Sequence, residues 1–149
     1  MDIRIGKSIV SLAGESTIHF LPQDYIDPYD QTSIDTAFLV PQSLPSLLRA
    51  GMAALLSSAE EISIPVGFVG LMGVRSTWAR LGIVSPLTIV DPGFKGVLTL
   101  EIFNAGRKRI LIRPGDAIWN LTLVSAPSEW PYTGRYQGQQ GITLPKALA

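Results

Sequence analysis

The sequence contains no cysteine and only one histidine, His19, among its 149 residues. Disulfides, thiolate nucleophiles and cysteine-based metal centres are therefore excluded. Zinc nucleobase deaminases need a His/Cys/Cys or three-cysteine site, which this chain cannot build. A Ser-His-Asp triad would have to use His19, which lies in a predicted strand away from any nucleophile motif, so we interpret His19 as structural.

Charge and long apolar runs are also scarce. Twelve basic and twelve acidic residues give a net charge of zero, so neither nucleic acid nor an anionic membrane is an expected partner. No apolar run approaches the ~20 residues of a membrane-spanning helix. The N-terminal stretch MDIRIGKSIVSLAG is too charged for a signal peptide. We expect a cytoplasmic protein that folds as one domain over residues 1–149.

Short apolar runs separated by Gly, Pro, Asp and Ser predict an all-β fold, closed or sandwiched. The predicted strands are Ser16–Phe20, Ser33–Val40, Glu61–Pro65, Gly67–Val74, Thr88–Val90, Gly96–Asn104, Arg109–Ile112 and Ala117–Val124. Alternation is clearest in Gly96–Asn104, where Val97, Thr99, Glu101 and Phe103 share one face and Leu98, Leu100 and Ile102 the other.

Two segments favour short helices. Pro45–Leu56 is rich in Leu and Ala but contains Gly51, and Met52–Leu56 reads equally well as a strand. Ser76–Leu81 follows a strand, and Ser76 is a candidate cap for one or two helical turns. Residues 125–149 combine aromatic, amide and glycine residues, which is typical of a lid over a ligand or of a frayed terminus.

A polar cluster follows the predicted strand that ends at Val74. Arg75, Ser76, Thr77 and Arg80 lie within six residues. Arginine presents a planar fork of donors to phosphate, and hydroxyl groups and backbone amides at a helix start add further donors. The alternative is a capped helix with two solvated arginines.

Two carboxylates follow the cluster. Asp91 precedes a Pro-Gly turn, where aspartate often only forms the turn. Glu101 lies in the middle of the strand LTLEIFN, where glutamate has poor β propensity. A partly buried glutamate has a raised pKa and can act as a general base near neutral pH. Glu101 is therefore a candidate catalytic residue, or a carboxylate exposed on one face.

Five blocks of the sequence together resemble the dCTP deaminase branch of the dUTPase-like superfamily. They are SIDTAFL (Ser33–Leu39), EEISIPVGFVGLMGVRSTWARLGI (Glu60–Ile83), TIVDPGFKGVLTLEIFN (Thr88–Asn104), RPGDAIWNLTL (Arg113–Leu123) and PYTGRYQGQQGITLP (Pro131–Pro145). The resemblance implies a distorted, jelly-roll-like β-barrel of the dUTPase fold with one or two short helices. It also implies a homotrimer whose sites lie between subunits, a C-terminal nucleotide-covering tail over 125–149, and Mg²⁺ held through the triphosphate rather than by protein ligands.

The resemblance assigns roles to individual residues. Glu101 matches the catalytic glutamate, Arg80 and Ser76 match residues that position base and water, and Asp91 matches the aspartate that meets the deoxyribose. The match for the phosphate-side loop is Arg75, Ser76 and Thr77, and the matches in the tail are Tyr132, Arg135, Tyr136 and Gln139.

The implied activity is zinc-independent deamination of dCTP to dUTP and ammonia, alone or followed by hydrolysis to dUMP and pyrophosphate. The alternatives are a dUTP pyrophosphatase, and a catalytically weak member of the fold that binds a nucleotide or a partner. The chain departs from the family pattern where Asp35 is followed by Thr36 and Ala37, and in the short hairpin at Ser85-Pro86. In relatives that hairpin recognises the pyrimidine base, so the choice between dCTP and dUTP depends on the hairpin.

Overall fold

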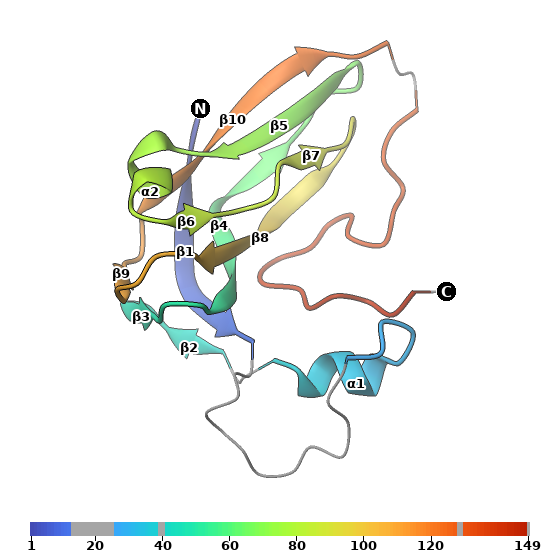
Figure 1. The fold of residues 1–149 in the computed structure, drawn as a ribbon. Coiled ribbons are helices and arrows are strands. Elements are labelled where there is room, and N and C mark those ends of the chain that lie inside the picture. The colour runs from blue at the N-terminus through green and yellow to red at the C-terminus, as the bar shows by residue number, and fades with distance from the viewer. Residues whose placement is uncertain (13–25, 39–40, 128–129, 149) are drawn as a thin grey trace.

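A computed structural model of the chain describes residues 1–12, 26–38, 41–127 and 130–148, and these form strands with two short helices (Figure 1). In chain order the elements are β1 (Asp2–Ser11), α1 (Gln31–Thr36), β2 (Gln42–Ser43), β3 (Ser46–Leu48), β4 (Ala53–Ser63), β5 (Phe68–Val74), α2 (Ser76–Arg80), β6 (Ile83–Val84), β7 (Thr88–Val90), β8 (Lys95–Asn104), β9 (Ile110–Ile112) and β10 (Ala117–Ser125). The prediction of an all-β fold with one or two short helices is confirmed.

One curled, antiparallel sheet forms a half-barrel around the core (Figure 1). Its strand order is β6-β8-β4-β1-β10-β5-β7, with β2 paired to β1, while β3 and β9 form a separate two-stranded ribbon. Its two long central strands, β1 and β4, bury Ile3, Ile5, Ile9, Ala54 and Leu56 in a single apolar core. Removing apolar surface from water is what stabilises this curled arrangement.

The predicted alternation in β8 is confirmed. Leu98, Leu100 and Ile102 are buried in the core, while Glu101 and Phe103 on the opposite face are exposed. Because successive side chains of a strand point to opposite faces, burying the leucines places Glu101 outside the core.

Two predicted elements in the first half of the chain are wrong. Residues 33–36 of the predicted strand Ser33–Val40 lie in helix α1, whose cap Asp30 accepts a hydrogen bond from the Thr32 amide at 2.9 Å. An aspartate at this position satisfies an amide at the helix start, and that capping outweighs the β-branched residues inside the helix. The predicted strand Ser16–Phe20, with His19, lies outside the described residues.

The predicted helix over Pro45–Leu56 is also wrong. The segment forms β3 and the first part of β4, joined by a turn in which Gly51 has a φ of 75°. The rival strand interpretation of Met52–Leu56 is confirmed from Ala53 onward. Sequence patterning missed β1, in which Ile3, Ile5 and Ile9 are buried, because polar and charged residues interrupt the apolar ones.

No helix among the described residues is long and apolar enough to cross a membrane.

Asn104, at the end of β8, ties the two-stranded ribbon to the main sheet. It is fully buried, and its amide nitrogen donates to the Leu48 carbonyl at 3.0 Å and to the Lys108 carbonyl at 2.9 Å. Its side-chain oxygen accepts from the Gly106 amide at 3.0 Å. Both donor hydrogens of this buried amide and one acceptor position of its oxygen are thus used, and the β3 end and the β8–β9 turn are held together.

The substitution Asn104→Asp is expected to lower thermal stability substantially. The aspartate places an acceptor oxygen where the amide nitrogen donated to two carbonyl oxygens. This lowers the free energy of unfolding by about 3 kcal/mol. Each kcal/mol lowers Tm by roughly 2–4 °C in a chain of this size. Thermal denaturation followed by circular dichroism measures the change. Asn120→Asp, at an exposed position of β10, is the matched control. Equal melting temperatures for the two variants would contradict the role of Asn104.

Candidate active site

A cavity of ≈ 580 Å³ opens between β8, the β7 strand and the C-terminal tail. Its walls are mainly apolar, with Leu55, Ile89 and Leu98 among them, and the polar groups in its lining are Thr88, Asp91, Thr99, Glu101, Tyr132, Tyr136, Gln139 and Thr143. An apolar cavity with a few convergent polar groups is typical of a small-molecule site.

Glu101 is the carboxylate on the β8 side of this cavity. It pairs with Leu55 across the β4–β8 ladder, and the neighbouring Ile102 and Leu98 belong to the cavity wall. Partial burial raises the pKa of Glu101, although its side chain keeps contact with solvent, and a hydrogen bond from the backbone opposes the shift. A carboxyl group with a raised pKa exchanges protons closer to neutral pH, which suits a general base that must later return the proton.

Asp91 faces the same cavity from the end of β7. The following turn is closed by a hydrogen bond from the Phe94 amide to the Asp91 carbonyl at 3.1 Å. Tyr132 of the tail donates its amide to the Pro92 carbonyl at 2.7 Å, and its ring packs on Phe94 with centroids 5.9 Å apart. Asp91 is therefore both a turn residue and a cavity residue, and the tail begins its course directly beside it.

The tail runs along β8 and forms the outer wall of the cavity. The Gly138 amide donates to the Lys95 carbonyl, and the Gln139 carbonyl accepts from the Val97 amide, both at 2.8 Å. A Cβ atom on Gly96 would lie 2.9 Å from the Gln139 carbonyl oxygen, so glycine is needed for this close approach. The tail is thus packed along β8 and is not a frayed terminus in this part.

Helix α1 holds the last part of the tail. Gln31 donates its side-chain amide to the Pro145 carbonyl at 3.1 Å and accepts from the Ala147 amide at 2.9 Å. Arg135 donates to the Ala147 carbonyl at 2.6 Å, and the Tyr136 hydroxyl accepts from the Lys146 amide at 3.2 Å. These contacts keep the Tyr136 ring in the cavity wall.

Gln139 contributes a side-chain oxygen that accepts no hydrogen bond from the described residues. Its side-chain oxygen is buried and has no hydrogen-bond partner among the described residues, while its side chain lines the cavity. A buried acceptor without a partner costs free energy, so a bound molecule that donates a hydrogen bond here would gain from it.

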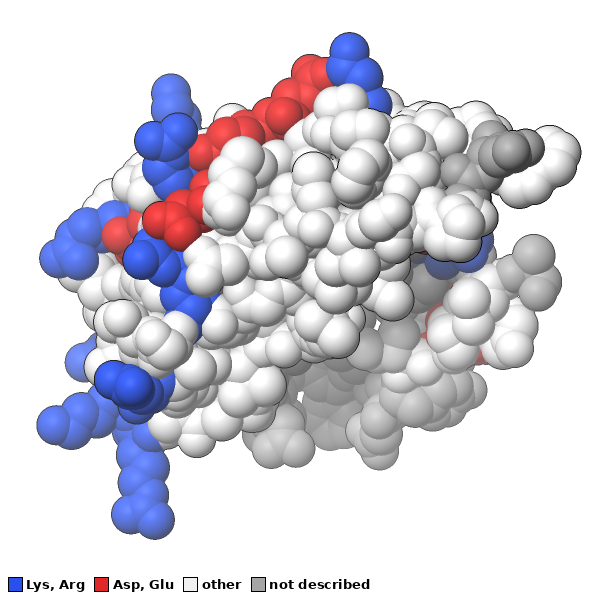
Figure 2. Space-filling model, turned by 90° about the horizontal axis from the view of Figure 1, so that it is seen from above, with Lys and Arg blue, Asp and Glu red and all other residues white. Residues whose placement is uncertain are grey.

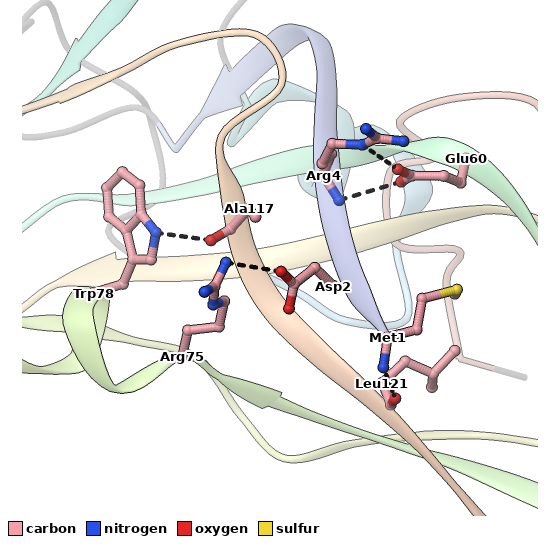
Figure 3. Close-up of polar contacts among 8 residues, drawn as sticks. All are labelled: Met1, Asp2, Arg4, Glu60, Arg75, Trp78, Ala117 and Leu121. Atoms are coloured by element: carbon pink, nitrogen blue, oxygen red, sulfur yellow. Dashed lines mark hydrogen bonds and ion pairs between the residues drawn. The ribbon is translucent and has the colours of Figure 1, made fainter.

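The predicted phosphate-side residues, on and just before α2, lie elsewhere in the fold, outside the cavity wall. Arg75 donates to Asp2 at 3.1 Å, and Trp78 donates its indole N–H to the Ala117 carbonyl at 2.9 Å (Figure 3). These contacts fix α2 against β1 and β10, on the far side of the fold from the tail (Figure 1). Helix α2 begins at Ser76 with Arg75 as its cap residue, which corrects the prediction that Ser76 caps it.

The structure therefore divides the predicted site residues into two groups. Glu101, Asp91, Tyr132, Tyr136 and Gln139 line one cavity. The second group is outside that cavity wall and consists of Arg75, Ser76, Thr77, Arg80 and Arg135. Ser76, Thr77 and Arg80 on α2 are exposed, and each presents its side chain to solvent.

Sequence reasoning missed three threonines and one glutamine of the site. Thr99 accepts from the Thr143 amide at 2.9 Å and both residues line the cavity, as does Thr88. The alternation that places Thr99 on the Glu101 face could have identified it. Gln31 had no such signal, because its function depends on a contact across 114 residues of sequence.

No group of three or more His, Cys, Asp or Glu side chains that could hold a metal ion occurs within residues 1–12, 26–38, 41–127 and 130–148.

Comparison with solved structures shows which fold this is. The structure is similar to 2′-deoxycytidine 5′-triphosphate deaminase from Agrobacterium tumefaciens, with a TM-score of 0.62 and 19% identity over 85% of this chain and 39% of that one. It is also similar to a dUTPase from phage phi11 of S. aureus, with a TM-score of 0.52 and 20% identity over 60% of this chain and 76% of the other. That dUTPase is described with a structural Mg(II) ion. The chain thus has the dUTPase-like fold.

The sequence places the chain more narrowly. Residues 1–126 match the family described as dCTP deaminase-like. The dCTP deaminase of Pyrobaculum arsenaticum is 35% identical over 148 residues, covering 99% of this chain and 80% of the relative. The dCTP deaminase of Aeropyrum pernix is 35% identical over 151 residues, covering 100% of this chain and 80% of the relative. The chain belongs to the dCTP deaminase-like family, which confirms the resemblance drawn from its motifs.

The substitution Glu101→Gln is expected to raise Tm at neutral pH, by an amount that disappears in acid. The pKa of Glu101 is raised above its usual value of 4.5 in the folded protein, so the folded state binds this proton more tightly than the unfolded state. Ionised Glu101 therefore lowers stability above the folded-state pKa and has no such effect below pH 4.5.

Thermal melts of the variant and the parent between pH 4 and pH 8 test this. Glu61→Gln serves as the control, because exposed Glu61 pairs with Lys95 at 3.3 Å and its loss should not stabilise the protein. A difference in Tm for Glu101→Gln that stays constant with pH would show that the carboxyl group is not desolvated.

Proposed function

We propose that the chain deaminates dCTP to dUTP and ammonia. The observation that supports this most directly is Glu101, a carboxyl group of raised pKa in the apolar cavity between β8 and the tail. The relatives named dCTP deaminase span nearly the whole chain, which agrees with this assignment.

In the proposed reaction Glu101 supplies the proton transfers. Its carboxylate takes a proton from a water molecule, and the resulting hydroxide attacks C4 of the cytosine. Glu101 passes this proton to N3 of the ring, then takes the proton of the new C4 hydroxyl group and delivers it to the amino group, so the C4–N4 bond breaks, ammonia leaves and the C4 carbonyl forms. Arg80 and Ser76 would position the base and the water and stabilise the charge that develops. No step uses a zinc ion.

We further propose that each complete site combines two copies of the chain in a homotrimer. The geometry supports this, because α2 with Ser76 and Arg80 lies across the fold from the Glu101 cavity of its own chain (Figure 1). Arg75 and Thr77 would meet the phosphates from one copy. Tyr132, Arg135, Tyr136 and Gln139 would cover the nucleotide from another, with Asp91 at the deoxyribose.

Magnesium would enter this site with the nucleotide. Mg²⁺ dehydrates reluctantly and commonly binds through phosphate oxygens and waters, so the triphosphate itself can be its main ligand. When bound, the ion would neutralise phosphate charge. Arg75 and the Thr77 hydroxyl would then bind the remaining phosphate oxygens.

A second candidate function is the hydrolysis of dUTP to dUMP and pyrophosphate, alone or after deamination. Asp91 favours it, since this carboxylate shares the cavity with Glu101 and could order a water for attack on the α-phosphorus. The short turn at Ser85-Pro86, which precedes β7, would decide which base is accepted.

Glu101→Gln is expected to reduce ammonia release from dCTP by at least about 10³-fold, because the glutamine cannot take up the proton of water. Binding of dCTP should change little. The measurement is chromatographic analysis of products after separate incubations with dCTP and dUTP, with Glu61→Gln as a variant of an exposed glutamate. Ammonia release that survives in Glu101→Gln would sink the proposed reaction, whereas pyrophosphate from dUTP without ammonia from dCTP would select the alternative.

Mixing two inactive variants tests the shared site. If Glu101 and Arg80 of one site come from different copies, trimers assembled from equal amounts of Glu101→Gln and Arg80→Ala chains contain intact sites. Random assembly at one shared interface should restore about a quarter of the sites. Co-refolded mixtures are assayed for ammonia against each variant alone. Mixtures that stay inactive although the chains co-assemble would place both residues of a site in one chain.

A further inference from the structure

Five exposed cations lie together at the end of the fold formed by α2, β3 and β9. We call them the basic turn surface, and they are Arg49, Arg80, Arg107, Lys108 and Arg109. Arg49 follows β3, Arg80 ends α2, and the other three occupy the β8–β9 turn. The sequence shows three of them as a run but gives no sign that the other two join it.

The end of α2 touches the β8–β9 turn directly. The Ala105 amide donates to the Gly82 carbonyl at 2.9 Å, and a Cβ atom on Gly82 would lie 2.9 Å from the Gly106 Cα. Gly82 has a φ of 96°, a conformation that other residues rarely adopt. Arg80 and Arg107 therefore stand on either side of one tight backbone contact.

The ribbon brings Arg49 to the same place. Leu48 pairs with Ile110 in the β3–β9 ladder, so Arg49 and Arg109 each lie one residue beyond a paired position, at the same end of the ribbon. Asn104 bonds to the Leu48 and Lys108 carbonyls, which fixes both turns to the end of β8. The spacing of these cations is thus set by rigid backbone.

The positive charge of this surface is not neutralised within the described chain. The ion pairs between described residues are Arg4 with Glu60, Arg75 with Asp2, and Lys95 with Glu61, and none uses a cation of the basic turn surface. Most Lys and Arg side chains visible in Figure 2 lie along its left side, where Asp and Glu side chains accompany the upper ones and none is visible beside the lower ones. In a protein with a net charge of zero, such a concentration gives one end a positive potential.

We propose that the basic turn surface steers oligophosphate anions toward the phosphate-binding loop at the start of α2. This inference rests on the proposed function, which assigns Arg75 and Thr77 to the triphosphate. A multiply charged anion is attracted over a distance of about 10 Å at moderate salt, so Arg49, Arg107, Lys108 and Arg109 would raise the association rate without contacting the bound nucleotide, whereas Arg80 would also contact it in the proposed site. The small extent of the surface fits a triphosphate, and the five side chains include no aromatic ring for stacking on nucleic-acid bases.

Stopped-flow tryptophan fluorescence can measure the association of dCTP, with inorganic tripolyphosphate as a competing probe. The variant Arg107→Gln/Lys108→Gln/Arg109→Gln should bind dCTP about tenfold more slowly than the parent chain at ~20 mM ionic strength. The difference should shrink to less than about twofold at ~0.5 M, because salt screens the field. The dissociation rate and kcat should stay unchanged.

Lys108→Gln and Arg4→Gln form a matched pair of single substitutions. Both remove one positive charge, but Arg4 is already paired with Glu60 at 2.7 Å, so only Lys108→Gln should slow association. If both substitutions slowed the association of dCTP equally, the net charge of the protein, and not the basic turn surface, would determine the association rate. A loss in the triple variant that persists at high salt, or an increased dissociation rate, would also overturn steering. So would tighter binding of duplex DNA than of tripolyphosphate, lost in the triple variant.

The two proposals fail in different ways. If dCTP associates with the expected salt dependence but no ammonia forms, the proposed reaction is wrong and steering stands. If ammonia forms and the association rate ignores both salt and the triple substitution, steering is wrong and the reaction stands.

Discussion

The fold depends on the two-faced character of β8. One face carries Leu98, Leu100 and Ile102, which must be buried for the half-barrel to exist. The strict alternation of a strand then turns Glu101 to the other face. The residue that makes the core and the residue proposed for chemistry are neighbours in sequence, so any shift of register in β8 would exchange their environments.

The same strand also organises the outer wall of the cavity. Its edge amides and carbonyls, at Lys95 and Val97, bond to the tail, and Thr99 bonds to Thr143 further along. The cavity therefore lies between β4, β7 and β8 and a tail segment that is hydrogen-bonded to β8. The pKa of Glu101 is raised by partial burial of its carboxyl group at this cavity.

Local patterns in the sequence predicted the parts of the site that depend on local spacing. The strand Thr88–Val90 was predicted with its observed bounds, and the faces of Gly96–Asn104 followed from alternation. The helix α1 was missed because its Asp30 cap outweighs β propensity. The separation of α2 from Glu101 in the fold could not be predicted from any local pattern. The position of α2 depends on its contacts with β1 and β10, among them the hydrogen bond between Arg75 and Asp2.

The path of the tail affects how fast a molecule bound in the cavity can leave it. The tail lies against β8, held at Gly138, at Gln139 and again by Gln31 on α1. A ligand enclosed by this wall leaves only when some of those hydrogen bonds open, and lid opening of this kind takes place in microseconds to milliseconds. The turnover rate would then be limited by detachment of the tail from β8. Substitutions at Gln31 or Gly96 would change that rate, although neither residue contacts a reacting atom.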